Sequence, residues 1–163
     1  MKMWEMLQVA YDFWRPNKYG IKPYLCKDGR KHPIAIICPG GAYSMVCSFV
    51  EGMPIAKALN KCGYHAVVAY YRTKKKARFP NPHEDLKRAI TDTFSHAEDW
   101  NLETDGWSLW GSSAGGHLAA SFCSTSSTES LTKTNSFPQH NISRRELLYS
   151  LRLMPFYYII KSL

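Results

Sequence analysis

The segment at residues 107–120 contains two adjacent serines flanked by glycines. The pattern Gly-x-Ser-x-Gly fits Ser113, because Gly111 stands two positions before it and Gly115 two positions after it. A serine in this pattern occupies a sharp turn between a strand and a helix, where a Cβ at either glycine would collide with neighbouring backbone. The turn lifts the hydroxyl above the sheet, as a nucleophile in acyl transfer requires. Ser113 is therefore the candidate nucleophile.

The residues on either side of the pattern have the composition that such a turn requires. Residues 107–110 alternate aromatic and smaller side chains as a short buried strand does, and residues 114–120 are small or favour a helix. The free N–H groups at the start of that helix, including that of Ala114, would face an oxyanion formed at the serine. A chance Gly/Ser turn is the alternative, but the flanking strand and helix favour a catalytic turn.

A second pair of glycines follows an apolar run at residues 34–38. Prolines bound this run, which is typical of a strand buried on both faces of a parallel sheet. The next residues read Pro-Gly-Gly-Ala-Tyr, and glycines directly after a strand allow backbone N–H groups to turn toward a substrate. Gly41 and Ala42 are the candidate second donors of an oxyanion hole. An ordinary strand-to-helix turn is the alternative, and the serine pattern downstream favours the donors.

Apolar periodicity predicts the elements that position these two loops. Residues 51–62 and 83–100 each carry one apolar face at helical spacing, and residues 64–71 form a further strand. A short helix at residues 3–14 and an edge strand within residues 19–28 are also predicted. The alternation of strand and helix is that of right-handed βαβ units. We therefore predict an α/β fold with a mostly parallel sheet and helices on both faces.

Two aspartates and a basic run have less specific interpretations. Asp85 and Asp92 lie on the predicted helix ahead of Ser113, where capping and a solvated face explain them better than catalysis does. The formal net charge is +8, and the densest basic run is residues 72–78. That run has no interleaved aromatic residues to stack on bases, so we predict a solvated loop and no nucleic-acid partner.

Length and cysteine content limit the class of protein. A chain of 163 residues with 45% hydrophobic content is expected to form one globular domain. The cysteines are odd in number and show no C-x-x-C spacing, which predicts reduced, buried thiols in a cytoplasmic protein. The first fourteen residues do not resemble a secretion signal, and no apolar run is long enough to span a membrane.

Three motifs together resemble the α/β-hydrolase family. They are Pro-Gly-Gly-Ala-Tyr at 39–43, Pro-Asn-Pro-His at 80–83 and Gly-Ser-Ser-Ala-Gly-Gly-His at 111–117. The resemblance covers residues 31–120 and is greatest to the acetyl-esterase and xylan-esterase branch, although Ala42 replaces the third glycine usual there. It implies Ser113 as nucleophile and an oxyanion hole made by Ala114 with Gly41 or Ala42. It also implies an ester substrate such as an acetylated carbohydrate, with no metal or organic cofactor.

The residues after Ser113 depart from this resemblance. Serine, acid and histidine follow one another in that order in the family, but the only later histidines are His117 and His140 and the only later acids are Glu129 and Glu146. His117 lies on the helix led by the serine and is expected to pack or to form a hydrogen bond. His140 lies in a polar stretch with no strand before it, so neither histidine is a clear base.

The last forty residues are therefore expected to be a non-family tail. We predict a hydrolase part at residues 1–123 and a tail at 124–163, which holds a polar loop (124–136), a helix (143–153) and a short apolar run (156–160). The hydrolase fold would then be truncated, without its C-terminal strands, and one sheet edge would be open to self-association unless the tail or a partner covers it. Ester hydrolysis would be weak or absent, and the alternative function is a non-catalytic truncated module. Whichever holds, Ser113 should have a positive φ.

Overall fold

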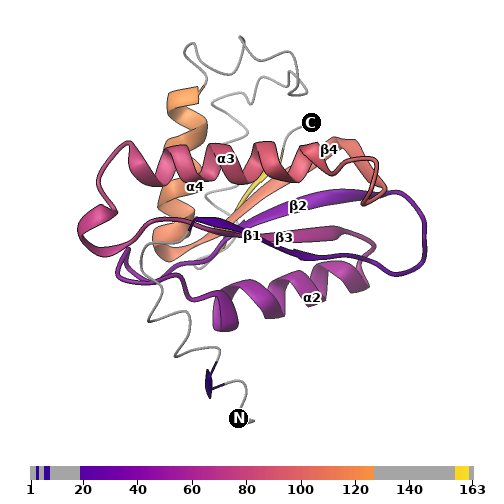
Figure 1. Cartoon of the computed structure of the whole chain (residues 1–163), viewed down its shortest axis with the longest axis horizontal. Helices are drawn as coiled ribbons and strands as arrows, with labels where there is room; N and C mark the ends of the chain where they lie inside the picture. Colours follow the sequence, from indigo (N-terminus) through magenta and orange to yellow (C-terminus); the bar gives the residue numbers. More distant parts are fainter. Residues whose placement is uncertain (1–2, 4–5, 8–18, 127–156, 162–163) are drawn as a thin grey trace.

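The computed structural model describes residues 3, 6–7, 19–126 and 157–161, and its core is a five-stranded sheet (Figure 1). The strands lie in the order β1-β3-β2-β4-β5. They are β1 (Gly20–Tyr24), β2 (His32–Cys38), β3 (His65–Tyr70), β4 (Leu102–Ser112) and β5 (Tyr157–Lys161). The helices are α2 (Met53–Lys61), α3 (Asn81–Ser95) and α4 (Ser113–Ser126), with a π-helical turn η1 (Ser48–Gly52) and a 3₁₀ turn η2 (Lys74–Lys76).

The sheet is mixed, with a parallel centre and antiparallel edges. β2 runs parallel to both β3 and β4, whereas β1 pairs with β3 and β5 pairs with β4 in antiparallel fashion. The three parallel strands are those that sequence periodicity predicted, and each is followed by a helix. The α/β class is confirmed, with more antiparallel pairing than predicted.

Helices cover both faces of the sheet because the side chains of β2 alternate between two apolar layers (Figure 1). Ile34 and Ile36 pack in the layer that includes residues of α3 and α4: Leu86, Ala89, Ile90, Leu118, Ala119 and Phe122. Ala35 and Ile37 point into the other layer with residues of β3 and α2: Ala66, Val68, Ala56 and Leu59. A strand buried on both faces needs this continuous apolar run.

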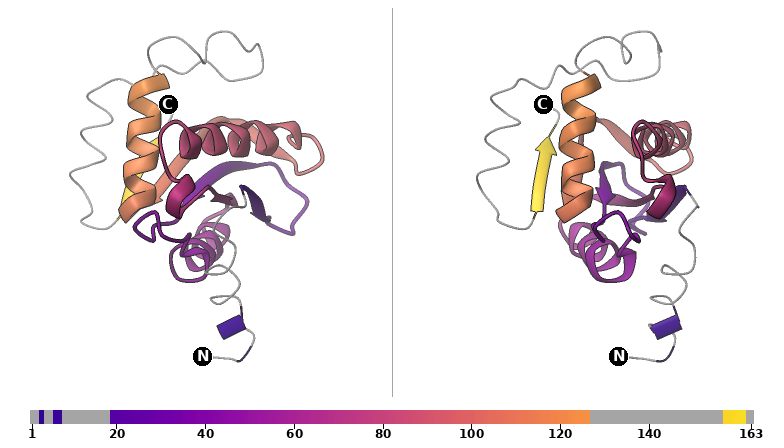
Figure 2. Two further views of the ribbon diagram at one scale, coloured as in Figure 1. Left: turned by 60° about the vertical axis from the view of Figure 1, so that its left-hand side comes forward. Right: turned by 90° about the vertical axis from the view of Figure 1, so that its left-hand side faces the viewer.

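The tail contributes a strand that covers the sheet edge at β4. β5 pairs with β4 from Ser108↔Lys161 to Ser112↔Tyr157 and lies beside α4 (Figure 2). An apolar run rich in β-formers can satisfy its backbone groups by pairing with a free strand edge, and β4 offers one. β5 covers the edge of β4, so the self-association predicted for an uncovered edge is not expected there.

The other predictions for the two chain ends are mostly untested. The helix predicted at residues 143–153, and nearly all of that at 3–14, lie outside the described residues. The loop predicted from residue 124 is wrong for residues 124–126, which belong to α4, and its remainder lies outside the described residues. The boundary between residues 123 and 124 stays a prediction, although β5 joins the same sheet as the part before it. In the described part of the chain, no helix is long and apolar enough to cross a membrane.

Candidate active site

The corner between β4 and α4 holds Ser113 in a strained conformation. Ser113 has φ 48°, so the positive φ that the sequence predicted is confirmed. The left-handed region is unfavourable for a residue with a Cβ, by roughly 1–2 kcal/mol. The side chain of Ser113 is exposed, whereas that of its neighbour Ser112 is buried. The corner thus directs one of the two serines outward and the other into the protein.

The two glycines of the pattern stand where no side chain fits. A Cβ on Gly111 would lie 2.5 Å from the carbonyl oxygen of Gly115, and a Cβ on Gly115 would lie 2.0 Å from the carbonyl oxygen of Cys38. Both obstacles are backbone atoms, which cannot move aside as a flexible side chain could. These contacts confirm the predicted collisions, and they let the start of α4 approach the end of β2.

The glycine-rich loop after β2 meets the serine corner. A Cβ on Gly40 would lie 2.9 Å from the Cβ of Ser113, so the two segments are in close contact. Gly41, Ala42 and Tyr43 all have positive φ, of 126°, 52° and 57°. Two of these are non-glycine residues in a region that they rarely adopt. Such strain persists only where the surrounding structure fixes it, and it is concentrated at functional sites.

Backbone N–H groups at this corner fit the predicted donor role. Among the described residues, the amides of Gly41 and Ala42 donate no hydrogen bond. Ala114 belongs to the first turn of α4, where N–H groups have no partner within the helix. The positive end of the helix dipole lies at the same place. The assignment of these three amides to an oxyanion hole stays a prediction.

Hydrogen bonds fix the loop along its length. The hydroxyl of Tyr71, which is buried, donates to the carbonyl oxygen of Pro39 at 2.5 Å, and the amide of Lys74 donates to that of Tyr43 at 2.7 Å. The amide of Cys47 donates to the carbonyl oxygen of Gly40 at 2.9 Å. Burial raises the pKa of Tyr71, so its hydroxyl stays protonated and able to donate. The loop conformation is therefore set in advance of any ligand.

Sequence reasoning missed one acid beside the serine. Glu51 was predicted only as the start of a helix, yet its Oε2 accepts a hydrogen bond from Ser112 Oγ at 2.5 Å and one from the Gly40 amide at 2.8 Å. The only sequence signal was a polar residue, Ser112, directly before the candidate nucleophile. The partners are 61 residues apart, so no local pattern joins them.

No histidine in the described part of the chain forms a hydrogen bond with the hydroxyl of Ser113. His117 Nδ1 forms a hydrogen bond with the hydroxyl of Tyr43 at 2.8 Å, which confirms the hydrogen-bonding role predicted for it. His83 Nε2 lies 2.9 Å from Ser121 Oγ, and burial, followed by the influence of His117, lowers the pKa of His83. The hydroxyl of Ser113 itself forms no hydrogen bond with any described residue.

The other candidates for the triad fall outside the described residues. These are His140, Glu129 and Glu146. A base and an acid for Ser113 are therefore not placed by the described structure.

The two aspartates of α3 have different surroundings. Asp92 is exposed, as predicted for a solvated face. Asp85 is fully buried, and its Oδ2 accepts hydrogen bonds from both the amide and the Nε of Arg72 at 2.8 Å. The solvated or capping role predicted for Asp85 is therefore wrong, because this carboxylate holds the start of the loop that follows β3. A buried carboxylate requires such a partner.

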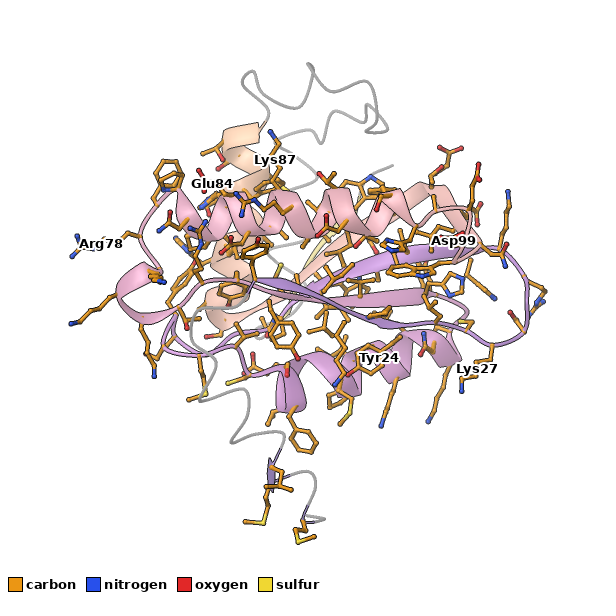
Figure 3. The ribbon with its side chains drawn as sticks, in the orientation of Figure 1. Tyr24, Lys27, Arg78, Glu84, Lys87 and Asp99 are labelled. Atoms are coloured by element: carbon orange, nitrogen blue, oxygen red, sulfur yellow. The ribbon has the colours of Figure 1, made fainter. Side chains whose placement is uncertain are left out.

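The basic run after β3 is solvated only in part. The three lysines at 74–76 are exposed in η2, and Arg78 extends away from the ribbon (Figure 3). Arg72 instead binds Asp85 and Glu84, the latter at 3.1 Å from its Nη2. The predicted solvated loop is confirmed for the lysines and wrong for Arg72.

None of the five cysteines forms a disulfide, and their burial differs. Cys38 is buried, whereas Cys62 is exposed, so the prediction of buried cysteines is wrong for Cys62. Burial raises the pKa of Cys38 and raises that of Cys123 to about 12. Both thiols are therefore protonated near neutral pH. Within the described residues, no three His, Cys, Asp or Glu side chains are grouped so that they could hold a metal ion.

Comparisons with known proteins agree on one family. The profile of the BD-FAE family matches residues 24–147, which extends beyond residue 120, where the motif resemblance ended. The endo-1,4-beta-xylanase B of Butyrivibrio fibrisolvens is 31% identical over 123 residues, and an acetylxylan esterase of Xylanibacter ruminicola is 34% identical over 82 residues. The match covers 68% and 50% of this chain, respectively.

Solved structures show the same fold. An acetyl ester-xyloside bifunctional hydrolase from Caldicellulosiruptor lactoaceticus aligns with a TM-score of 0.57 and 32% identity, over 64% of this chain and 38% of that one. A lipase/esterase from Lactobacillus plantarum aligns with a TM-score of 0.65 and 27% identity, over 75% and 53%. The match spans only 19% of the xylanase and 17% of the acetylxylan esterase. The chain belongs to the BD-FAE family, in the esterase branch of the α/β-hydrolases.

Proposed function

We propose that this chain carries the nucleophile and oxyanion hole of a serine carboxylic-ester hydrolase. The single observation that carries the proposal is the corner itself: an exposed, strained Ser113 between two glycines that admit no side chain. We interpret this corner as a nucleophile elbow. A strained serine at a strand-to-helix turn is the arrangement that exposes Oγ to a substrate in this class of enzyme.

The proposed chemistry begins when a base takes the proton of Ser113 Oγ as this oxygen attacks the ester carbonyl carbon, and the base later passes that proton to the leaving alcohol. The carbonyl π electrons move to the oxygen, which becomes an oxyanion and accepts hydrogen bonds from the amide of Ala114 and from that of Gly41 or Ala42. Collapse of this intermediate breaks the bond to the alcohol, which leaves with a proton, and the acyl group stays on Ser113. Water then releases the acid. No cofactor is needed, because a base would activate the serine.

The proposed substrates are acetyl esters of carbohydrates. This proposal rests on the relatives, since two of them are named as xylan-directed proteins and one solved structure as an acetyl ester-xyloside hydrolase. The match covers a small share of those relatives, so we propose only the class of substrate, acetyl esters of carbohydrates, and no individual compound.

We further propose that hydrolysis by this chain is weak or absent. A serine hydroxyl is a poor nucleophile until a base removes its proton, and no described histidine forms a hydrogen bond with Ser113 Oγ. Serine hydrolases without their triad keep about 10³ to 10⁴ of acceleration over water, after a loss on the order of 10⁶. The alternative, favoured by the same observation, is a non-catalytic hydrolase module.

Hydrolysis of p-nitrophenyl acetate tests the nucleophile. We expect slow turnover that disappears in Ser113→Ala, with Ser112→Ala as the neighbouring control that keeps Ser113. Equal rates in the unmodified chain and Ser113→Ala would contradict the proposal and favour the non-catalytic module.

A fluorophosphonate probe tests for an activated serine. We expect little or no labelling of Ser113. Stoichiometric labelling that is lost in His140→Ala but kept in His117→Ala would show that the tail supplies a base, and would overturn the proposal of weak activity.

Location and association stay proposals as well. The five cysteines, none of which forms a disulfide, support the predicted cytoplasmic location, because reduced cysteines are typical of that compartment. Self-association would involve the outer edge of β5, the last strand of the sheet, and not the edge of β4.

A further inference from the structure

The carboxylate of Glu51 links the two segments that form the proposed site. Its Oε2 accepts hydrogen bonds from the amide of Gly40, at the end of β2, and from the hydroxyl of Ser112, at the end of β4. The Gly40 amide also lies 3.2 Å from Ser112 Oγ, so the three groups form a closed triangle. One oxygen atom thus joins the glycine-rich loop to the residue before the nucleophile.

We propose that Glu51 is a positioning residue that holds the oxyanion-binding loop against Ser113. The proposal rests on the function proposed above and extends it to a residue that touches neither substrate nor reacting atoms. Gly41 and Ala42 follow Gly40 directly, so the place of their N–H groups depends on where Gly40 is held. The place of Ser113 depends in the same way on Ser112.

The packing around Gly40 shows why the hydrogen bonds of Glu51 set the distance between the glycine-rich loop and Ser113. A Cβ there would lie 2.6 Å from Glu51 Oε2, 2.8 Å from the Ser112 carbonyl oxygen and 2.9 Å from the Ser113 Cβ. Gly40 is therefore enclosed between the carboxylate on one side and the nucleophile corner on the other. Both Gly40 and Ser112 are buried, so water does not readily replace the carboxylate as their acceptor.

An ionised acceptor suits this task better than a neutral one. Hydrogen bonds to a carboxylate are shorter and roughly twice as strong as those between neutral groups. The loop they hold is strained, with three consecutive residues of positive φ, and it would relax if its first residue were released. Because an oxyanion hole acts on charge that develops in the transition state, release should lower kcat and leave KM nearly unchanged.

The test compares Glu51→Ala, Glu51→Gln and the matched control Glu98→Gln, which changes an exposed acid on the segment after α3. The residual turnover of p-nitrophenyl acetate is a sensitive readout, because acceleration without a base comes from the oxyanion hole and binding. We expect kcat to fall about 10- to 100-fold in Glu51→Ala, with KM within about twofold. Glu51→Gln, which keeps an acceptor oxygen, should recover part of this loss, and Glu98→Gln should not change it.

Amide hydrogen exchange of Gly40 gives a readout independent of activity. We expect exchange at Gly40 to rise at least about tenfold in Glu51→Ala, while Ile36 in the middle of β2 keeps its protection. Wild-type kcat in Glu51→Ala would overturn the inference and leave the proposed function standing, as would unchanged exchange at Gly40. Absence of Ser113-dependent turnover in the unmodified chain would favour the non-catalytic module, and exchange at Gly40 in Glu51→Ala would then decide the inference by itself.

Discussion

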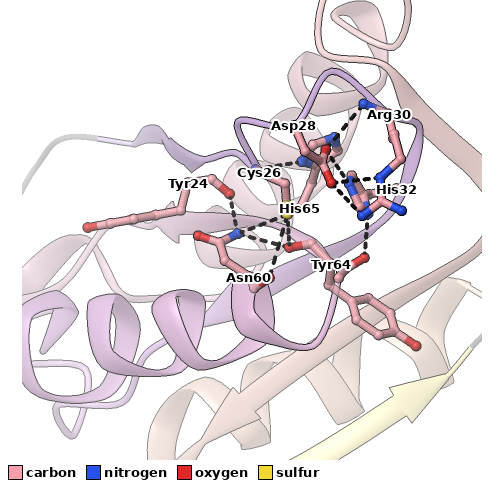
Figure 4. A network of polar contacts seen from close by, with 9 residues as sticks. Tyr24, Cys26, Asp28, Arg30, His32, Asn60, Tyr64 and His65 are labelled. Atoms are coloured by element: carbon pink, nitrogen blue, oxygen red, sulfur yellow. Dashed lines mark hydrogen bonds and ion pairs between the residues drawn. The ribbon is translucent and has the colours of Figure 1, made fainter.

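The two ends of the parallel strands use polar groups in opposite ways. At the carboxyl ends of β2 and β4, an exposed hydroxyl on Ser113 has no hydrogen-bond partner among the described residues. At the amino ends of β2 and β3, a network of side chains is bonded to backbone groups (Figure 4). One end of the sheet presents an unpaired reactive group, whereas at the other Asn60 and His32 are bonded and the buried His65 Nε2 has no described partner.

The network at the amino ends joins three segments of the chain. Asn60 Nδ2 donates to the carbonyl oxygens of Tyr24 and Tyr64, each at 2.9 Å. His32 Nδ1 lies 2.8 Å from the carbonyl oxygen of Gly63, and its Nε2 lies 2.8 Å from Asp28 Oδ1. These bonds tie the end of α2 to β1, and the loop after α2 to the start of β2 (Figure 4).

Backbone strain is distributed in the same way. Positive φ values near the network fall on Gly29, Gly63 and Asn101, residue types that adopt this region readily. Those at the site fall on Gly41 and also on Ala42, Tyr43 and Ser113, three residue types that rarely adopt this region. The amino end of the sheet therefore contributes to stability, whereas the carboxyl end holds a reactive geometry that lowers stability.

The largest effect is expected from Gly115→Ala. The new Cβ would meet the backbone of Cys38 and Pro39, at 2.0 Å and 2.6 Å from their carbonyl oxygens, so β2 or α4 must move. We expect a loss of about 3 kcal/mol or more in the free energy of unfolding, measured by urea denaturation.

The control for this change is Gly29→Ala. Gly29 has φ 71° and open space around its Cβ position, so this variant isolates backbone strain from collision. It should lose only about 1–2 kcal/mol. A loss in Gly115→Ala no larger than that would show that the corner is looser than its contacts indicate.

The second largest effect is expected from changes at Asn60, in the network at the amino ends of β2 and β3. Replacing Asn60 with Ala removes the donor to two carbonyl oxygens, which should lower the free energy of unfolding by about 1–3 kcal/mol. Asn60→Asp should be destabilised at least as much, because it places a carboxylate oxygen, an acceptor, against the same two carbonyl oxygens. Turnover per folded molecule should be unchanged in both variants. A selective loss of turnover at wild-type stability would contradict the division between the two ends.

The sequence was sufficient where a signal is local. The buried strand of β2 is a continuous apolar run, and the serine corner is encoded within five residues, so both were predicted with their consequences for φ and for the flanking glycines. The start of β4 was not predicted, because polar residues and Gly106 interrupt its pattern. Gly106 has φ 76°, and the β2–β4 register shifts between Pro33 and Ala35.

Roles that depend on tertiary contacts could not be predicted from the sequence. Asp85 and Glu51 both lie in helical segments, and their roles arise from Arg72 and Ser112, which only the fold brings close. β5 was missed for a related reason. A short apolar run indicates burial, but its pairing depends on the free edge of β4.

A smaller effect, of opposite sign, is expected from Ser113→Gly. Glycine adopts positive φ without the steric penalty of a Cβ, so the variant should gain about 1 kcal/mol in stability while losing all Ser113-dependent turnover. Ser113→Ala keeps the Cβ and should lose turnover with stability within about 0.5 kcal/mol of wild type. If both variants unfold at the same urea concentration, the corner stores no strain in the serine.

The smallest effect is a pH dependence at the amino end. Burial, followed by the nearby His32, lowers the pKa of His65, whose Nδ1 accepts a hydrogen bond from the Cys26 amide at 3.0 Å. The unfolded chain therefore binds this proton first, near its ordinary pKa of about 6.5. The stability contributed by neutral His65 is complete above about pH 6.5. It is lost as the pH falls from there through the lower folded-state pKa.

Urea midpoints at pH 7.5 and 5.5 test this dependence, with His65→Gln as the comparison. The glutamine amide oxygen can accept the same hydrogen bond but does not titrate, so the drop in midpoint between the two pH values should be smaller in the variant. It should not vanish, because burial also lowers the pKa of His83, which contributes in the same direction. An equal drop in both proteins would show that His65 takes up its proton without disturbing the network, and that the amino end owes its stability to Asn60 and His32 instead.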